Sequence, residues 1–209
     1  MGVLPGDTPA IVSGDHNGTV RVWRLADGTP VGKPIRGHHQ GVYAVAVGVL
    51  PDGTPVIISG VGDGTVRVWH LADGTPVWEP TEGHDSAVCA VAVGVLPDGT
   101  PVIISGSEDG TVRVWRLADG TPVGKPIRGH NDMVGAVAIG ALPDGTLVVI
   151  SGSEDGMVRV WHLAESTQPV PPLRFPQPVT GVAVHGNSII SAAGTDIAVH
   201  HSAPPQPIR

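Results

Sequence analysis

The chain has 209 residues, 41% of them hydrophobic, with 30 glycines and 21 prolines. This composition is typical of one sizeable, turn-rich all-β domain. The formal net charge of −7 argues against nonspecific nucleic-acid binding, which needs clustered lysines and arginines.

The sequence also indicates the cellular compartment of the protein. No apolar run approaches the length of a membrane-spanning helix, and residues 1–6 do not resemble a secretory signal. Cys89 is the only cysteine, so an intrachain disulfide is impossible and a reducing compartment is favoured. We therefore expect a cytoplasmic protein that contacts no membrane.

Internal repetition organises the chain. The stretch Ser105–Trp115 recurs at a step of 46 residues, and the tryptophans that close it are Trp23, Trp69, Trp115 and Trp161. A strict period of this length predicts a repeat array. Residues 1–36 are the incomplete first unit, because Gly2–Pro5 aligns with Gly48–Pro51, just after the innermost strand of a unit. Three strands are expected there.

Residues 37–165 contain three complete units, of which the second is typical. Val88–Val93 and Pro101–Ser105 are short apolar runs, and the β-branched second run is typical of a strand covered on both faces. Thr111–Trp115 is a third strand. Pro122–Ile127 predicts a weak outer strand, because its two prolines suit only the edge of a sheet. Asp-Gly pairs predict tight turns, so each unit is four antiparallel strands.

The last unit is degenerate. Residues 166–201 carry neither Gly-His nor a closing tryptophan, and strands are expected at Val179–Val184, Ser188–Ser191 and Asp196–Val199. Terminal units of repeat arrays are commonly atypical. Residues 202–209 are expected to form a tail.

A four-stranded unit of this size cannot bury its apolar faces alone, and stacking such units around an axis gives a propeller. Gly-His, a Ser-Gly-Ser-x-Asp-Gly turn and a strand that ends in Trp together resemble the WD40 repeat. The second letter of the WD dipeptide is missing, because Arg24, His70, Arg116 and His162 follow the tryptophans. The resemblance implies an all-β fold of WD40-type β-propeller blades, about four and a half in number.

The resemblance also implies three buried tetrads of His, Ser, Asp and Trp. They are His38, Ser59, Asp63 and Trp69; His84, Ser105, Asp109 and Trp115; and His130, Ser151, Asp155 and Trp161. A Ser-His-Asp catalytic triad is the alternative, but three copies in register favour a structural hydrogen-bond network. No cofactor is expected, and one histidine per blade leaves no metal site.

The blades are not expected to close into a ring. The resembled family most often has seven blades, so the array looks like the C-terminal part of a larger one. With an inner strand missing at one end and an outer strand at the other, we expect an open arc. Ile11 and Val12 should then lack the neighbour that Ile57 and Ile58 have, and self-association through open blade edges is expected.

The repeats differ mainly on one face. Residues 37–82 and 83–128 agree at 35 of 46 positions, and several of their differences fall in the loop after Gly-His and the turn before the tetrad Asp. The resemblance places both on one end of the blades, here called the upper face. The candidate partner-binding residues are His39, Gln40, Tyr43, Asp85, Ser86, Cys89, Glu108, Asn131, Asp132 and Glu154. The four acidic residues among them favour a basic peptide or protein.

The predicted function is a non-enzymatic protein-interaction scaffold or sensor module, since binding residues ride on loops over a rigid scaffold. One alternative is a truncated fragment of a larger multidomain regulatory protein with little activity of its own. Another is a propeller enzyme, which needs a unique polar cluster that the repeats do not provide. Trp78 replaces a repeated glycine in the outer strand, and it is either a contact at the rim or a lone surface apolar residue.

Overall fold

The computed structural model describes residues 2–4, 8–81, 83–142, 145–163, 167–185 and 188–201. Within these ranges every regular element is a β-strand, so none of them contains a helix that could cross a membrane. The strands form five antiparallel sheets of three or four strands each. The predicted all-β class is confirmed.

Each sheet is one blade, and its strands follow the chain from the inner to the outer edge. Blade 1 contains β1 (Gly2–Leu4), β2 (Thr8–Gly14), β3 (Thr19–Arg24) and β4 (Pro30–Arg36). Blade 2 contains β5 (Val42–Val49), β6 (Pro55–Val61) and β7 (Val66–His70). Blade 3 contains β8 (Val88–Val95), β9 (Pro101–Ser107), β10 (Thr111–Arg116) and β11 (Ile127–Arg128). Blade 4 contains β12 (Val134–Ala141), β13 (Leu147–Ser153), β14 (Met157–His162) and β15 (Leu173–Arg174). Blade 5 contains β16 (Val179–His185), β17 (Ser188–Ala193) and β18 (Asp196–His201).

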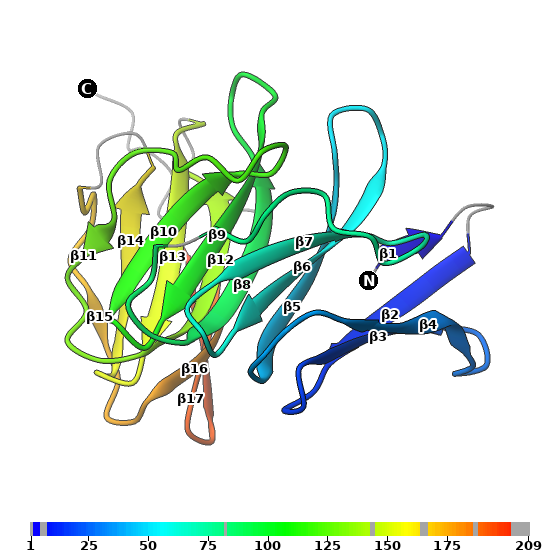
Figure 1. Ribbon diagram of the computed structural model, residues 1–209. Helices are drawn as coiled ribbons and strands as arrows, with labels where there is room; N and C mark the ends of the chain where they lie inside the picture. The colour runs from blue at the N-terminus through cyan, green and yellow to red at the C-terminus, as the bar shows by residue number, and fades with distance from the viewer. Residues whose placement is uncertain are drawn as a thin grey trace.

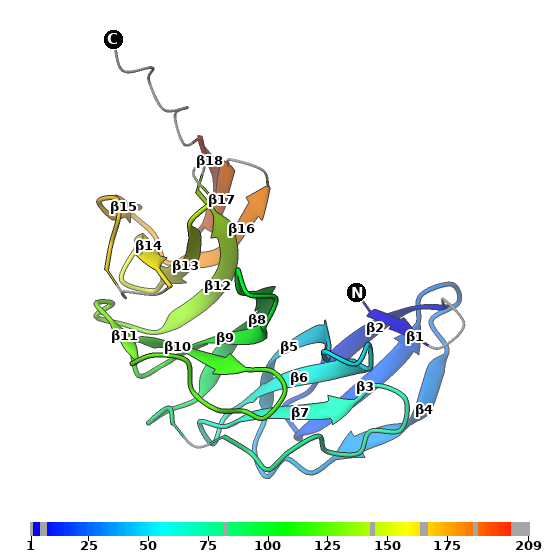
Figure 2. The same cartoon turned by 90° about the horizontal axis from the view of Figure 1, so that it is seen from above.

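The blades follow one another along an open arc. The inner strands β5, β8, β12 and β16 lie next to one another in sequence order. Figure 1 shows the sheets packed face to face, and Figure 2, from above, shows blade 1 and blade 5 well apart at the two ends. The expectation of an open array of propeller-like blades is therefore confirmed.

Side-chain alternation explains why the second strand of each blade is apolar throughout. In β6, Ile57 packs against blade 1, whereas Val56 and Ile58 pack against blade 3. We call the side of a blade that meets the preceding blade its incoming face, and the other side its outgoing face. All three side chains are fully buried, and full burial of one such side chain stabilises the fold by about 1.5–3 kcal/mol.

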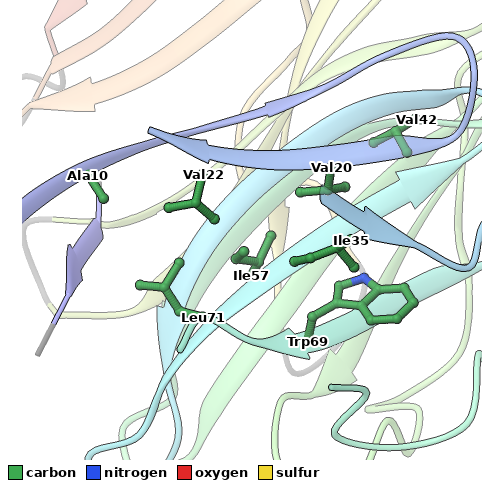
Figure 3. Close-up of a cluster of buried hydrophobic side chains, with 8 residues drawn as sticks. All are labelled: Ala10, Val20, Val22, Ile35, Val42, Ile57, Trp69 and Leu71. Atoms are coloured by element: carbon green, nitrogen blue, oxygen red, sulfur yellow. The ribbon is translucent and has the colours of Figure 1, made fainter. Parts of the chain in front are cut away.

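The interface between blades 1 and 2 shows the common plan (Figure 3). Val20, Val22 and Ile35 of blade 1 meet the incoming face of blade 2, to which Ile57 and Trp69 belong. Trp115 and Trp161 occupy the matching places in the next two interfaces. The repeated tryptophan is thus the largest side chain that each of blades 2, 3 and 4 presents to the blade before it.

Tight turns bring neighbouring blades together at the upper face. Gly64 has φ +82° and lies so close to the Gly-His loop of the next blade that an added Cβ would be 2.6 Å from the carbonyl oxygen of His84. Gly18 repeats this arrangement, with 2.8 Å to the carbonyl oxygen of His38. Only glycine combines this backbone conformation with so close an approach.

Three expectations need correction. Blade 1 has an inner strand after all, since β1 pairs with β2 from Gly2–Ala10 to Leu4–Thr8. Val12 is not on the uncovered face, because alternation turns it toward blade 2 while Ile11 stays 43% exposed. The outer strand of blade 3 is shorter than predicted, because Pro122 makes only an isolated bridge to Trp115 before β11 begins.

Trp78 is not a rim contact. Blade 2 has only isolated bridges, Trp69–Pro76 and Val66–Thr81, in place of an outer strand. From this segment Trp78 turns inward to the interface of blades 2 and 3, where its indole N–H donates to the carbonyl oxygen of Leu117 at 3.1 Å.

The two matched isoleucines test whether the first incoming face is open. Ile57→Ala should lower the free energy of unfolding by about 2–5 kcal/mol, because it leaves a cavity between two blades. Ile11→Ala should cost less than about 1 kcal/mol, because its side chain is already partly in water. Urea denaturation of both variants measures the difference. Equal losses would mean that another layer covers Ile11 in solution.

Candidate functional site

Blade 3 contains a continuous hydrogen-bonded tetrad. The Trp115 indole N–H donates to Ser105 Oγ at 2.8 Å, and the Ser105 hydroxyl lies 2.8 Å from His84 Nε2. His84 Nδ1 is 3.0 Å from Asp109 Oδ2. An ionised carboxylate only accepts hydrogen bonds, so the imidazole donates through Nδ1 and accepts from the serine through Nε2. Each of the four tetrad side chains in blade 3 then has a hydrogen-bond partner.

Blade 4 repeats the arrangement. Trp161 donates to Ser151 Oγ at 2.8 Å, Ser151 Oγ is 2.7 Å from His130 Nε2, and His130 Nδ1 is 3.0 Å from Asp155 Oδ2. Blade 1 retains only the first link, from Trp23 to Ser13 Oγ at 2.9 Å. The structure therefore brings the predicted residues together completely in two blades.

Blade 2 differs at the carboxylate. Ser59 Oγ still meets His38 Nε2 at 2.8 Å and accepts from Trp69 at 3.0 Å. Asp63, however, does not reach the histidine. Its Oδ1 accepts from the Thr65 hydroxyl and its Oδ2 pairs with Arg67 at 3.2 Å. His38 Nδ1 lies instead 3.2 Å from the Gly18 carbonyl oxygen of blade 1.

A buried serine explains the difference and was missed from the sequence. Ser107 Oγ accepts from the Asp109 amide at 3.1 Å and donates to the Ser86 carbonyl oxygen at 3.1 Å, which ties the turn to the Gly-His loop. Ser153 does the same in blade 4. Val61 stands at this position in blade 2 and can make neither bond. The change from Val61 to Ser107 between repeats is the signal in the sequence that could have predicted this difference.

The charge states agree with this geometry. Burial lowers the pKa of His84 below its usual value, and the nearby Asp109 carboxylate only partly opposes this. Burial raises the pKa of Asp109, but hydrogen bonds from Thr111 and from the Asp85 amide, together with the electrostatic effect of His84, outweigh it and lower that pKa to about 2. At neutral pH the pair is therefore a neutral imidazole beside an ionised carboxylate.

The candidate partner-binding residues divide by exposure. Eight are exposed, namely His39, Gln40, Tyr43, Asp85, Glu108, Asn131, Asp132 and Glu154, and two are half-buried, namely Ser86 and Cys89. Some also hold the loops in place, since the backbone amides of Asp85 and Asn131 donate to the carboxylates of Asp109 and Asp155. The Ser86 hydroxyl donates to Glu108 Oε2 at 2.8 Å, so loop and turn meet in blade 3.

Two groups of these residues lie close together on the upper face. Tyr43 is 49% exposed and lies where blades 1 and 2 meet. Its ring is edge-on to that of His16, with ring centroids 5.3 Å apart. Burial first, and then the negative charges of Glu108 and Glu154, raise the pKa of the Cys89 thiol to about 11. Carboxylates from blades 3 and 4 thus act on one inner-strand side chain.

A metal centre has no support from side-chain placement. The described residues contain no group of three His, Cys, Asp or Glu side chains that could hold a metal ion. The three buried tetrad histidines each have at least one hydrogen-bond partner on each ring nitrogen.

Comparison with known families agrees with this fold. The WD domain, G-beta repeat model matches residues 28–70, 74–116 and 120–162, which is more than half of the chain. The chain belongs to the WD40 repeat family. WD40 repeats are generally protein-interaction modules, and the family is generally a non-catalytic scaffold.

A solved structure supports the same assignment. The crystal structure of the computationally designed Ika8 protein aligns with a TM-score of 0.74 and 27% sequence identity. The alignment covers 92% of this WD40 chain and 55% of the Ika8 chain, so the protein spans little more than half of that structure. A search of curated protein sequences gave no match of comparable strength.

Matched aspartates test the tetrad. Asp109→Ala should lower the free energy of unfolding by about 1–3 kcal/mol, because it leaves the buried His84 Nδ1 with fewer partners. Asp63→Ala should cost less than about 1 kcal/mol, since that carboxylate bonds a partly exposed arginine and its own turn. Urea denaturation at neutral pH compares them. Equal costs would show that the bond to the histidine adds nothing beyond the turn.

The pH dependence of stability should have two stages. Because the folded-state pKa of His84 lies below the unfolded value of 6.5, folding opposes its protonation and stability falls as the pH drops below that value. Asp109 contributes stability that is present above 3.8 and is lost as the pH falls from there toward its folded-state pKa of about 2. Asp109→Ala should weaken the second stage, which urea denaturation over a pH series measures.

Proposed function

We propose that this WD40 chain is a non-enzymatic interaction module whose upper face binds a basic peptide or a basic segment of a protein. The supporting observation is that the upper-face loops and turns of blades 3 and 4 carry four exposed carboxylates. Glu108 and Glu154 come from different blades, and both raise the pKa of the Cys89 thiol. Asp85 and Asp132 are exposed in the adjoining loops. A lysine or arginine side chain would meet complementary charge there.

Fixed geometry favours recognition at this place. The bond from Ser86 holds the Glu108 carboxylate at 2.8 Å, so less side-chain freedom is lost when a cation binds. Ser107 and Ser153 are fully buried and fasten the turns that carry the two glutamates. Tyr43, near the blade 1 joint, supplies an aromatic surface of the kind that is enriched in protein interfaces.

The buried tetrads support a non-enzymatic role. Ser59, Ser105 and Ser151 are 0% exposed, and each accepts an indole N–H while lying beside a histidine. A nucleophilic serine must be reachable by substrate and must face an oxyanion hole. These serines therefore fit the function of supporting the loops. Because the lone Cys89 makes no disulfide, a cytoplasmic location is part of the proposal.

We further propose that the 209-residue chain self-associates head to tail through its end blades. Leu25 is 42% exposed on the incoming face of blade 1, whereas its counterpart Leu71 is 4% exposed. Ile197 and Val199 are 75% and 52% exposed on the outgoing face of blade 5. Incoming and outgoing faces already pack on each other four times within the chain, so two copies offer complementary surfaces.

Light scattering tests this association. The chain should form dimers or larger species, and Ile197→Lys should shift it toward the monomer because a charge would be buried at the contact. A compact monomer at all concentrations would contradict the self-association proposal and leave the peptide proposal untouched.

Charge neutralisation tests peptide binding. The double change Glu108→Gln and Glu154→Gln should weaken binding to lysine- and arginine-rich peptides about tenfold at low ionic strength, and the loss should shrink as salt is added. Fluorescence anisotropy with a panel of labelled basic, neutral and acidic peptides measures this. The selectivity for basic peptides should be lost together with the affinity.

The matched control is the double change Asp52→Asn and Asp98→Asn, which also removes two negative charges; Asp98 is the exposed counterpart of Asp52 in blade 3. Asp52 is an exposed carboxylate in the turn after β5, at the opposite end of the blade from the Gly-His loop. This double change alters the net charge without touching the upper face, so basic peptides should still bind. An equal loss in this control would show that only the net charge matters, and no peptide selectivity in the parent would refute the proposal.

A further inference from the structure

An apolar cavity lies between blades 4 and 5. Its volume is about 370 Å³. Val148, Ile150 and Val160 form the wall on the outgoing face of blade 4, and Ile189 and His200 belong to the wall on blade 5. Figure 2 shows the two sheets that enclose it, β12–β15 and β16–β18, lying against each other. Nothing in the proposed peptide site uses this space.

Strand register explains why the space is open. Trp161 lies opposite Val149 in blade 4, and Trp115 lies opposite Ile103 in blade 3. In blade 5 the residue in the same place, opposite Ile189, is His200. An imidazole is much smaller than an indole, so this interface lacks the side chain that fills the three others.

The histidine of the tetrad has also been replaced. An added Cβ on Gly156 would be 2.6 Å from the Phe175 carbonyl oxygen, just as Gly64 approaches the carbonyl of His84. Phe175 therefore takes the place of the tetrad histidine. Its ring is edge-on to His200 at 5.9 Å, close to the 6.1 Å between His130 and Trp161.

These two replacements leave polar atoms without partners. Ser191 is the counterpart of Ser151 and is 0% exposed. Among the described residues, neither Ser191 Oγ nor the buried His200 Nε2 has a hydrogen-bond partner. Buried polar atoms without partners are rare in native proteins, because each costs the free energy of its desolvation. His200 belongs to the cavity wall while its Nε2 is itself buried, so a ligand there reaches this nitrogen once the imidazole rotates toward the cavity.

The interface of blades 2 and 3 shows what fits. The corresponding walls there include Val56, Ile58, Val68 and Ile103. Trp78 packs among them in addition to Trp115, with its N–H on a carbonyl oxygen. The residue two repeats further along is Val170, which is 42% exposed and lines the cavity. An indole ring is thus accommodated where blade 4 presents only a valine.

We propose that the cavity binds a small planar aromatic molecule carrying one N–H or O–H group, of the indole or phenol class. The apolar walls would cover the ring, and the N–H or O–H would donate to His200 Nε2. Sites of this kind are mostly apolar with a few placed polar groups, and their volumes begin near 300 Å³. Apolar cavities in protein cores bind such rings because water gains little by entering them.

Indole is the first probe. Isothermal titration of the 209-residue chain should give one site with a dissociation constant of about 1 mM or tighter, as is reasonable for a well-buried small ring. Methyl NMR should locate the shifts at Val148, Ile150, Val160 and Ile189. The absence of saturable binding, or shifts confined to other interfaces, would overturn the proposal.

Val170→Trp is the decisive variant, because it copies Trp78 into the cavity. Its side chain should fill the space, weaken indole binding at least about tenfold and raise the melting temperature. Val170→Ala is the matched control, which leaves the cavity open and should bind indole as the parent does. Unchanged binding in a folded Val170→Trp protein would place the ligand elsewhere and refute the site.

The polar contact has its own test. His200→Phe removes the ring nitrogen but keeps an aromatic side chain, so it should weaken indole about fivefold. Toluene has no N–H or O–H group and should bind the parent and His200→Phe with similar affinity. Equal affinity of indole for both proteins would refute the role of His200. None of these variants should change binding of basic peptides at the upper face, so failure of this proposal and failure of the proposed function can be told apart.

Discussion

A single blade of this protein has two apolar faces and no layer of its own to cover either. That constraint determines most of what the structure shows. Strands such as β6 are apolar at every position because alternate side chains point into two different interfaces. The tryptophans recur because each fills the space beside the preceding blade. Where the array stops, as at Leu25 and Ile197, the same residue types face water. Stability is therefore a property of neighbouring pairs of blades rather than of any one repeat.

Much of the fold could be predicted because the repeat displays it several times. Strand order, turn positions and the open arc follow from the period and from residue types such as the Asp-Gly pairs. Features that occur once were beyond the pattern. The sequence contains nothing to say that Trp78 turns inward, since a tryptophan in an outer strand is compatible with either side. Val12 was misplaced because Ile11 and Val12 were treated as one face, although strand geometry separates them. The tetrads were predicted from resemblance, and Asp63 departs from them because one buried residue, Val61, is apolar.

Blades 2 and 5 show how a repeated network changes when one member changes. In blade 2, Val61 cannot make the hydrogen bonds that Ser107 makes to the turn and the loop of blade 3. Asp63 pairs with Arg67, and His38 lies beside the Gly18 carbonyl oxygen. In blade 5 the histidine, the aspartate and the tryptophan are all replaced, and Phe175 meets His200 in place of a histidine meeting a tryptophan. The contact between two rings is thus kept in blade 5, while the hydrogen bonds of the tetrad are lost. The interface of blades 4 and 5 therefore contains both the cavity and, among the described residues, two buried polar atoms without partners.

The turn glycines allow neighbouring blades to meet main chain against main chain. At Gly18, Gly64, Gly110 and Gly156, the main chain of one blade approaches the carbonyl oxygen of the next with no side chain between them. Because main chain touches main chain at each joint, variation in the surrounding loops leaves this spacing alone. The distance between neighbouring blades at these four contacts thus depends on four absent methyl groups. Substitutions in the loops around them can change the surface of the upper face without changing this distance.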